Sequence, residues 1–149
     1  MAIDTASILA AAAARAKEKN LPYAGLLTPA EAAALHEAGG ARIVDTRTKA
    51  ERDLIGYVPG SIAIEWYDYP GKVRNTRFMD ELRQAADPAA PVAFLCRTGV
   101  RSGHAATLAT EHGYKAAYNI LEGFEGDKNE QGQRRVNGWQ VAGLPWRQD

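Results

Sequence analysis

The chain has 149 residues, of which 24 % are charged, and its 18 lysines and arginines are balanced by 18 aspartates and glutamates. This length suits one domain with its own hydrophobic core, and a neutral chain has no basic excess that would indicate a nucleic-acid partner. A single cysteine excludes an internal disulfide and, with three scattered histidines, makes a poor ligand set for structural zinc. We therefore expect a reducing, cytoplasmic setting, and no metal or organic cofactor.

The first 20 residues are rich in alanine but do not have the pattern of a secretory signal. Asp4 stands where such a signal carries lysine or arginine, and no stretch reaches the roughly 18 consecutive apolar residues of a membrane span. The segment instead predicts a helix over 4–20, capped by Asp4 or Thr5 and ended by Asn20 and Pro22. Its apolar face is thin. We treat residues 1–24 as an N-terminal helical extension and 25–149 as the main domain.

A second helix is predicted over 28–38. Thr28 is suited to the N-cap, Pro29 to the first helical position and Glu31 to the capping box, and Gly39 and Gly40 end the helix.

The rest of the chain alternates between short apolar strands and helices. The strands are predicted at 41–46, 61–66, 91–96 and 116–120, and the helices at 75–88 and 100–112. This alternation is typical of an α/β fold in which helices cover both faces of a parallel sheet. The polar segment 125–138 has no apolar period and predicts a surface loop or hairpin.

The only cysteine, Cys96, ends the apolar strand "PVAFLC" and precedes a loop that leads into a helix. Ligands of open parallel sheets bind outside the carboxyl ends of the strands, and a helix N-terminus attracts anions through its free N–H groups and its dipole. Gly99 lets the loop curl, and Arg97 and Arg101 add positive charge. The same features stabilise a thiolate, which is a competent nucleophile.

Two other interpretations of this cysteine compete with a reactive thiol. A lone cysteine is often only a small core residue, but the cationic, glycine-bearing loop favours a reactive thiol here. A Cys/His pair would require an imidazole near the thiol. His36, His104 and His112 lie at positions that favour capping, surface or packing roles.

Three segments together resemble the rhodanese family of sulfurtransferases: "IVDTRTKAERDLIGYVPGSIAI", "FLCRTGVRS" and "LEGFEG" with a later "GWQVAGLPW". The resemblance covers residues 25–146 and implies a five-stranded parallel sheet flanked by helices. It also implies that Cys96 takes a sulfur from a thiosulfate-like donor as a persulfide and passes it to a thiol or cyanide. A protein sulfur acceptor is a further possibility.

The resemblance carries over residue by residue to the cysteine loop. It assigns the nucleophile to Cys96 and the binding of the sulfur species to six residues, namely Arg97, Thr98, Gly99, Val100, Arg101 and Ser102. Backbone N–H groups from Arg97 to Arg101 are expected to hold the persulfide. The two arginine side chains are expected to recognise the donor, and Ser102 to steady the loop end.

Other classes of function remain open at this point. Related phosphatases and arsenate reductases separate the cysteine from the arginine by five residues, whereas here only four separate Cys96 from Arg101, which suits a sulfur atom better than phosphate. A rhodanese module that docks a partner or relays sulfur is the main alternative to a small-donor enzyme. The oligomeric state is left open.

Several positions depart from the family pattern or carry other charges. Tyr57 replaces a histidine of the family's "GHIPGA" segment, and residues 127–137 form an insertion with Arg134 and Arg135, for which we favour a solvated loop over a border of the active site. Arg47 is expected to form a structural ion pair with a carboxylate. Trp66, Tyr67 and Tyr69 are candidates either for a pocket wall or for packing at the strand end.

Overall fold

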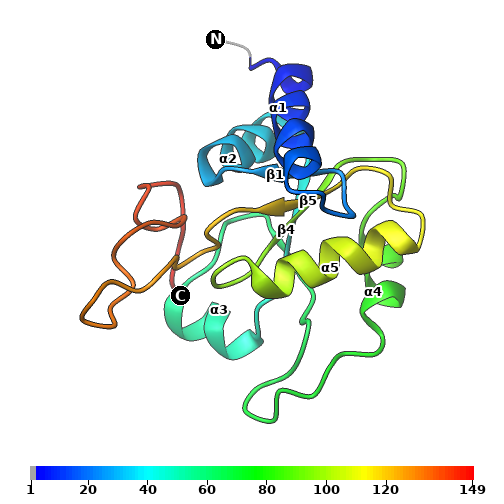
Figure 1. Cartoon of the computed structure of the whole chain (residues 1–149). Helices are drawn as coiled ribbons and strands as arrows, with labels where there is room; N and C mark the ends of the chain where they lie inside the picture. Colours follow the sequence, from blue (N-terminus) through cyan, green and yellow to red (C-terminus); the bar gives the residue numbers. More distant parts are fainter. Residues whose placement is uncertain (1–2) are drawn as a thin grey trace.

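The computed structural model describes residues 3–149, and in this range helices and strands alternate along the chain (Figure 1). In chain order the elements are α1 (Thr5–Glu18), β1 (Gly25–Leu27), α2 (Pro29–Ala38), β2 (Arg42–Asp45), α3 (Lys49–Ile55), β3 (Ile62–Ala63), α4 (Phe78–Ala85), β4 (Val92–Leu95), α5 (Val100–Glu111) and β5 (Ala117–Ile120).

The strands form one five-stranded sheet in the order β1-β5-β4-β2-β3. Every neighbouring pair is parallel, with Asp45 opposite Leu95 and Phe94 opposite Asn119 in the register. The predicted α/β fold with a five-stranded parallel sheet is therefore confirmed. Because β4 is the central strand, the residue that follows it lies in the middle of the carboxyl edge.

Helices cover both faces of the sheet (Figure 1). On one face, Ala12 of α1 and Leu35 of α2 pack with Ala93 and Leu95 of β4. On the other face, side chains of α4 and α5 pack with Val92 and Phe94 of the same strand. This alternation along β4 follows from the period of two in a strand, and both faces are buried, as is usual for parallel sheets.

The helix starts follow the capping signals in the sequence. The Asp4 side chain accepts a hydrogen bond from the Ser7 backbone N–H, and the capping box of Thr28 and Glu31 is present at the start of α2. The thin apolar face of α1 is buried through Ala12 and Ala16, and Arg15 donates hydrogen bonds to Glu31. The N-terminal extension is thus packed onto the domain.

Four elements differ from the prediction. The strand predicted over 61–66 is limited to Ile62–Ala63, because its partner β2 ends at Asp45 and only isolated hydrogen bonds follow. Helix α3 and strand β1 were not predicted, since each is short and lacks a clear apolar period. Helix α4 starts at Phe78, three residues later than predicted.

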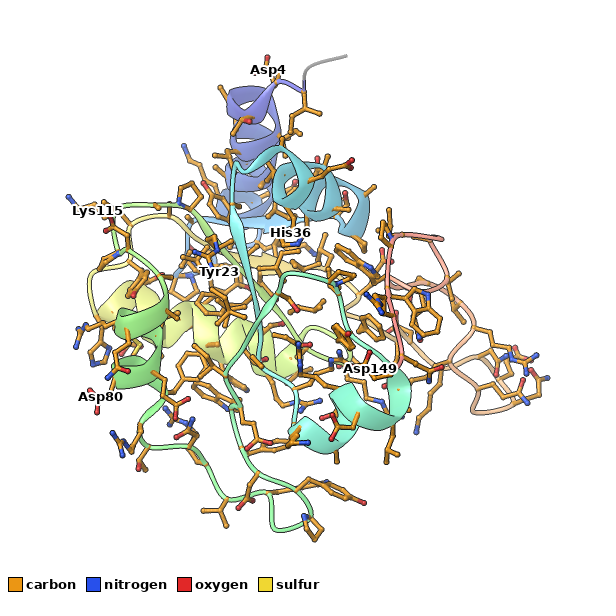
Figure 2. The ribbon with its side chains drawn as sticks, turned by 180° about the vertical axis from the view of Figure 1, so that it is seen from behind. Asp4, Tyr23, His36, Asp80, Lys115 and Asp149 are labelled. Carbon is orange, nitrogen blue, oxygen red and sulfur yellow. The ribbon has the colours of Figure 1, made fainter. Side chains whose placement is uncertain are left out.

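The segment after β5 returns along the domain to α3. Trp139 is buried, the Tyr57 and Arg147 backbones exchange hydrogen bonds, and the Gln148 side chain donates to the Leu54 carbonyl. The end of the chain accordingly lies beside α3 in Figure 1, and Asp149 is labelled at this place in Figure 2. Within residues 3–149, no helix is long and apolar enough to cross a membrane.

Candidate active site

Cys96 follows the last residue of β4 and lies at the centre of the carboxyl edge of the sheet. The residue is 1 % exposed. Its sulfur is therefore almost fully covered by the protein at the carboxyl edge of the sheet. This is the crevice in which open parallel sheets bind ligands.

The loop after Cys96 curls over the sulfur and leads directly into α5. The backbone N–H of Gly99 donates a hydrogen bond to Cys96 Sγ at 3.0 Å. Gly99 is the N-cap of α5 with φ of +107°, a conformation that side chains other than glycine rarely adopt. No side chain caps this helix end, so its N–H groups and its positive dipole end are directed at the sulfur and its surroundings.

A polar network holds the sulfur from the side of β5. Ser102 Oγ lies 3.2 Å from Cys96 Sγ and 2.6 Å from Asn119 Oδ1, and Asn119 Nδ2 donates to the Gly99 carbonyl at 3.1 Å. The hydroxyl of Ser102 has one proton and can serve only one of its two acceptors at a time. The role expected of Ser102, to steady the loop end, stays a prediction. Asn119 was not predicted, and it links the loop to the sheet through its contacts with Ser102 and the Gly99 carbonyl.

Arg101 anchors the loop to α3. Its Nη1 and Nη2 donate to Glu51 Oε1 and Oε2 at 2.7 and 2.8 Å, and the two side chains are 10 % and 20 % exposed. Burial alone would raise the pKa of Glu51, but the hydrogen bonds and the charge of Arg101, together with hydrogen bonds from Thr48, outweigh it and lower the pKa of this carboxyl. The Tyr67 ring covers the guanidinium at 4.8 Å. The guanidinium thus has a structural partner, and its part in donor recognition stays a prediction.

The segment after β5 is hydrogen-bonded to the backbone of the cysteine loop and packs closely against it. Phe124 N–H donates to the Cys96 carbonyl at 2.8 Å, and Glu125 N–H donates to the Arg97 carbonyl at 3.0 Å. Gly123, with φ of +71°, approaches so closely that an added Cβ would lie 2.5 Å from the Arg97 carbonyl carbon. The side chain of Arg97 pairs with Glu125, Nε to Oε2 at 3.1 Å. The "LEGFEG" segment therefore holds the cysteine loop through backbone hydrogen bonds and through the Arg97–Glu125 ion pair.

A cavity of about 630 Å³ opens over the loop between α3, the 66–72 segment and the start of α5. Trp66, Tyr67 and Tyr69 all line it, which agrees with the predicted pocket wall, although Trp66 also packs on Phe78. The complete lining is Thr48, Ala50, Glu51, Leu54, Ile55, Trp66, Tyr67, Tyr69, Lys72, Arg97, Thr98, Val100, Arg101, His104, Glu125 and Arg134.

The insertion 127–137 contributes one side chain to this cavity. Arg134 lines the cavity and donates to the Gly126 carbonyl at 2.7 Å, whereas Arg135 is exposed. Most of the insertion is a solvated loop, as favoured from the sequence. At Arg134, however, it borders the mouth of the site.

Asp45 and Arg47 form the expected structural ion pair beneath the site. Both side chains are fully buried, and Arg47 Nη2 lies 2.8 Å from Asp45 Oδ2 and donates to the Gly56 carbonyl. Arg52 of α3 also donates to Asp45. The predicted structural role of Arg47 is confirmed.

No group of three or more histidine, cysteine, aspartate and glutamate side chains lies in an arrangement that could hold a metal ion within residues 3–149.

The fold and the loop together define a parallel α/β domain with a cysteine loop at the carboxyl end of its central strand. The chain matches the family description "Rhodanese-like domain" over residues 28–130, and it belongs to this family. The uncharacterized protein RC0915 of Rickettsia conorii is 35 % identical over 112 residues, which cover 70 % of this chain and 80 % of that protein.

Two solved structures are similar over most of the chain. Rv0390 from M. tuberculosis has 40 % sequence identity and a TM-score of 0.77, and the match covers 85 % of this chain and 99 % of that one. The protein RPA3614 from Rhodopseudomonas palustris, described as a possible tyrosine phosphatase, has 25 % identity and a TM-score of 0.54, with 97 % and 95 % covered. The fold is one that supports sulfur transfer or sulfur relay.

Proposed function

We propose that the protein is a sulfurtransferase that carries a sulfane sulfur on Cys96 from a thiosulfate-like donor to a thiol or cyanide. The observation that carries the proposal is the contact of Cys96 Sγ with the Gly99 N–H at 3.0 Å, at the uncapped N-terminus of α5. An N–H group and a helix dipole held in this position stabilise negative charge on sulfur in both the thiolate and the persulfide.

In the first step, the Cys96 thiolate attacks the outer sulfur of thiosulfate. A new S–S bond forms to Cys96 while the old S–S bond breaks, and sulfite leaves with the electron pair. In the second step, cyanide or a thiolate attacks the terminal sulfur of the persulfide, giving thiocyanate or a new persulfide and restoring the Cys96 thiolate. Each step conserves charge and requires no further redox partner.

A phosphatase is the second candidate, because the similar Rhodopseudomonas protein is described as a possible tyrosine phosphatase. Phosphate recognition by this type of loop needs an arginine that is available to the anion. Here Arg101 comes after four intervening residues and makes two hydrogen bonds to Glu51. Both features favour sulfur transfer over phosphoryl transfer.

The test is the intact mass of the protein after incubation with thiosulfate. We expect the wild type to gain one sulfur atom that cyanide removes, and Cys96→Ser to gain none. Circular dichroism of both proteins controls for folding. A folded wild type with a reduced thiol that gains no sulfur would contradict the proposal for this donor, and turnover of an aryl phosphate would support the phosphatase instead.

A further inference from the structure

We infer that the sulfur acceptor of Cys96 is a cysteine in an acidic, protruding segment of a partner protein. Two projecting segments of this chain, the hairpin 66–75 and the insertion 127–137, would bind that partner. The inference rests on the proposed sulfur transfer and concerns its second step. The position of the two segments, their exposed side chains and their charge support it separately.

The hairpin 66–75 and the insertion 127–137 project on either side of α3, next to the cysteine loop (Figures 1 and 2). Lys72 of the hairpin and Arg134 of the insertion line the same cavity as Thr98 of the loop. A partner that contacts both segments therefore covers the cysteine loop between them.

The hairpin has a fixed base and an exposed tip. At the base, the Asn75 N–H donates to the Trp66 carbonyl at 2.8 Å, and Asn75 Nδ2 donates to the Glu65 carbonyl at 2.8 Å. The Trp66 ring also packs on Phe78, with ring centroids 5.2 Å apart. All residues of the tip, 68–74, are exposed. A tip that is presented on a fixed base loses little conformational freedom when a partner binds.

Both segments hold apolar side chains in water. Tyr69 and Val73 of the hairpin are 63 % and 66 % exposed, and Val136 of the insertion is 53 % exposed. Each of these side chains has a lysine or arginine within one position of it in the chain. Tyrosine and arginine are enriched in protein–protein interfaces, so this composition fits a polypeptide better than a small inorganic acceptor.

Positive charge predominates on the two segments, although the chain as a whole is neutral. They carry five lysines and arginines and three carboxylates, namely Lys72, Arg74, Lys128, Arg134 and Arg135 against Asp68, Asp127 and Glu130. None of the five cations has a carboxylate within 4.0 Å among the described residues, 3–149. The two carboxylates beside the cysteine loop, Glu51 and Glu125, are paired with arginines. The charge of the two segments therefore attracts an acidic partner and repels a basic one.

The burial of Cys96 restricts the shape of the acceptor. Because Cys96 is 1 % exposed, the acceptor thiol has to protrude from its own protein to reach the persulfide. The acceptor thiolate attacks the outer sulfur of the persulfide and forms a new S–S bond to it. The bond between that sulfur and Cys96 Sγ breaks, Cys96 keeps the electron pair as a thiolate, and the acceptor cysteine becomes the persulfide.

The experiment offers cysteine peptides to the full chain after Cys96 has been loaded with thiosulfate and the excess donor removed. The peptides have equal length and one central cysteine, which is flanked by glutamates, by glutamines or by lysines. Mass spectrometry follows the sulfur atom that the peptide gains and the protein loses. Each rate constant is divided by that of the same peptide with a small neutral disulfide, which removes differences in thiol reactivity.

We expect the glutamate peptide to take the sulfur at least about tenfold faster than the glutamine peptide at low salt, and the lysine peptide to be slowest. In about 1 M salt, where charges are screened beyond about 3 Å, this preference should disappear.

Two double variants locate the effect. Lys72→Glu/Arg135→Glu reverses one exposed charge on each segment and should reduce the preference for the glutamate peptide to within about twofold. Lys19→Glu/Lys115→Glu is the matched control, with the same change in net charge. Lys19 and Lys115 are exposed and precede β1 and β5, at the amino edge of the sheet, and Lys115 is labelled in Figure 2. The control should keep the preference, and circular dichroism checks the folding of both variants.

The outcomes separate the inference from the proposed function. If cyanide removes the sulfur but the peptides take it without regard to charge, or do not take it, the inference is overturned and the proposed function stands. A preference that survives in Lys72→Glu/Arg135→Glu or in about 1 M salt also overturns the inference, because the two segments are then not its source. If thiosulfate does not load Cys96, the proposed function fails and the inference fails with it.

Discussion

The ion pair between Glu51 and Arg101 offers a direct test of how the cysteine loop is held. In Glu51→Gln the negative charge is removed while the side-chain size and one carbonyl oxygen are kept. Glutamine also serves in a capping box, so the cap at the start of α3 is retained. The variant therefore removes the charge opposite Arg101 and one of the two acceptors of its hydrogen bonds, which are 2.7 and 2.8 Å long.

The expected magnitude follows from burial. Breaking a fully buried pair costs about 3–5 kcal/mol, and an exposed pair contributes about 0–1 kcal/mol. At 10 % and 20 % exposure the pair lies nearer the buried limit, so we expect Glu51→Gln to lower the free energy of unfolding by about 2–3 kcal/mol at neutral pH. The cost arises because the Arg101 cation loses its partner without regaining water.

Urea denaturation of the wild type and the variant measures this difference. Asp53→Asn is the matched control, because Asp53 lies on the same helix and pairs with Lys49 at the exposed surface. We expect the control to change the free energy of unfolding by less than about 0.5 kcal/mol. If Glu51→Gln changes it no more than Asp53→Asn does, the pair does not anchor the loop and this reasoning is refuted.

Three further predictions concern the same loop. Since the pKa of Glu51 is lowered in the folded protein, its contribution to the free energy of unfolding is present above the ordinary pKa of 4.5 and is lost as the pH falls through the lowered value. The free energies of unfolding of the wild type and Glu51→Gln, measured by urea titration, should therefore converge at low pH. Gly123→Ala should lower the free energy of unfolding by at least about 2 kcal/mol and slow sulfur loading of Cys96, because the added Cβ would meet the loop backbone. Gly39→Ala is the control, since Gly39 has a similar positive φ but nothing within 4 Å of the added Cβ. An equal loss of stability in Gly39→Ala would show that backbone strain alone is responsible. Asn119→Ala should slow sulfur loading by about tenfold with mass spectrometry as the readout, and an unchanged rate would mean that the network on Cys96 has no part in positioning it.

The sheet and its central cysteine were predictable because their signals are local. Strands β2, β4 and β5 are short apolar runs, and Cys96 directly follows one of them. Helix α3 was missed because it has only seven residues and no buried ones. Thr48 and Glu51 nevertheless repeat the capping box that identified α2, so the signal was present in the sequence.

The partners of the loop were harder to predict, because no local pattern joins them to it. Asn119 reaches Ser102 only through the pairing of β5 with β4, which sets Asn119 opposite Phe94. Glu51 reaches Arg101 across 50 positions of the chain. Such contacts depend on register and helix placement, which hydrophobic periodicity does not specify to a single residue.

These distant contacts explain how a short loop holds its shape around a sulfur atom. The loop is tied to α3 through Glu51, to β5 through Asn119 and to the segment at Gly123 through backbone hydrogen bonds. Hydrogen-bond donors that are already fixed before the reaction need no reorganisation as charge moves onto the sulfur. The anchoring also favours sulfur transfer over phosphoryl transfer. A phosphatase loop would direct its arginine at the substrate, whereas Arg101 here supports the loop and the backbone N–H of Gly99 contacts Cys96 Sγ. The geometry of the loop is therefore suited to a single charged sulfur, which is what the proposed sulfur transfer requires.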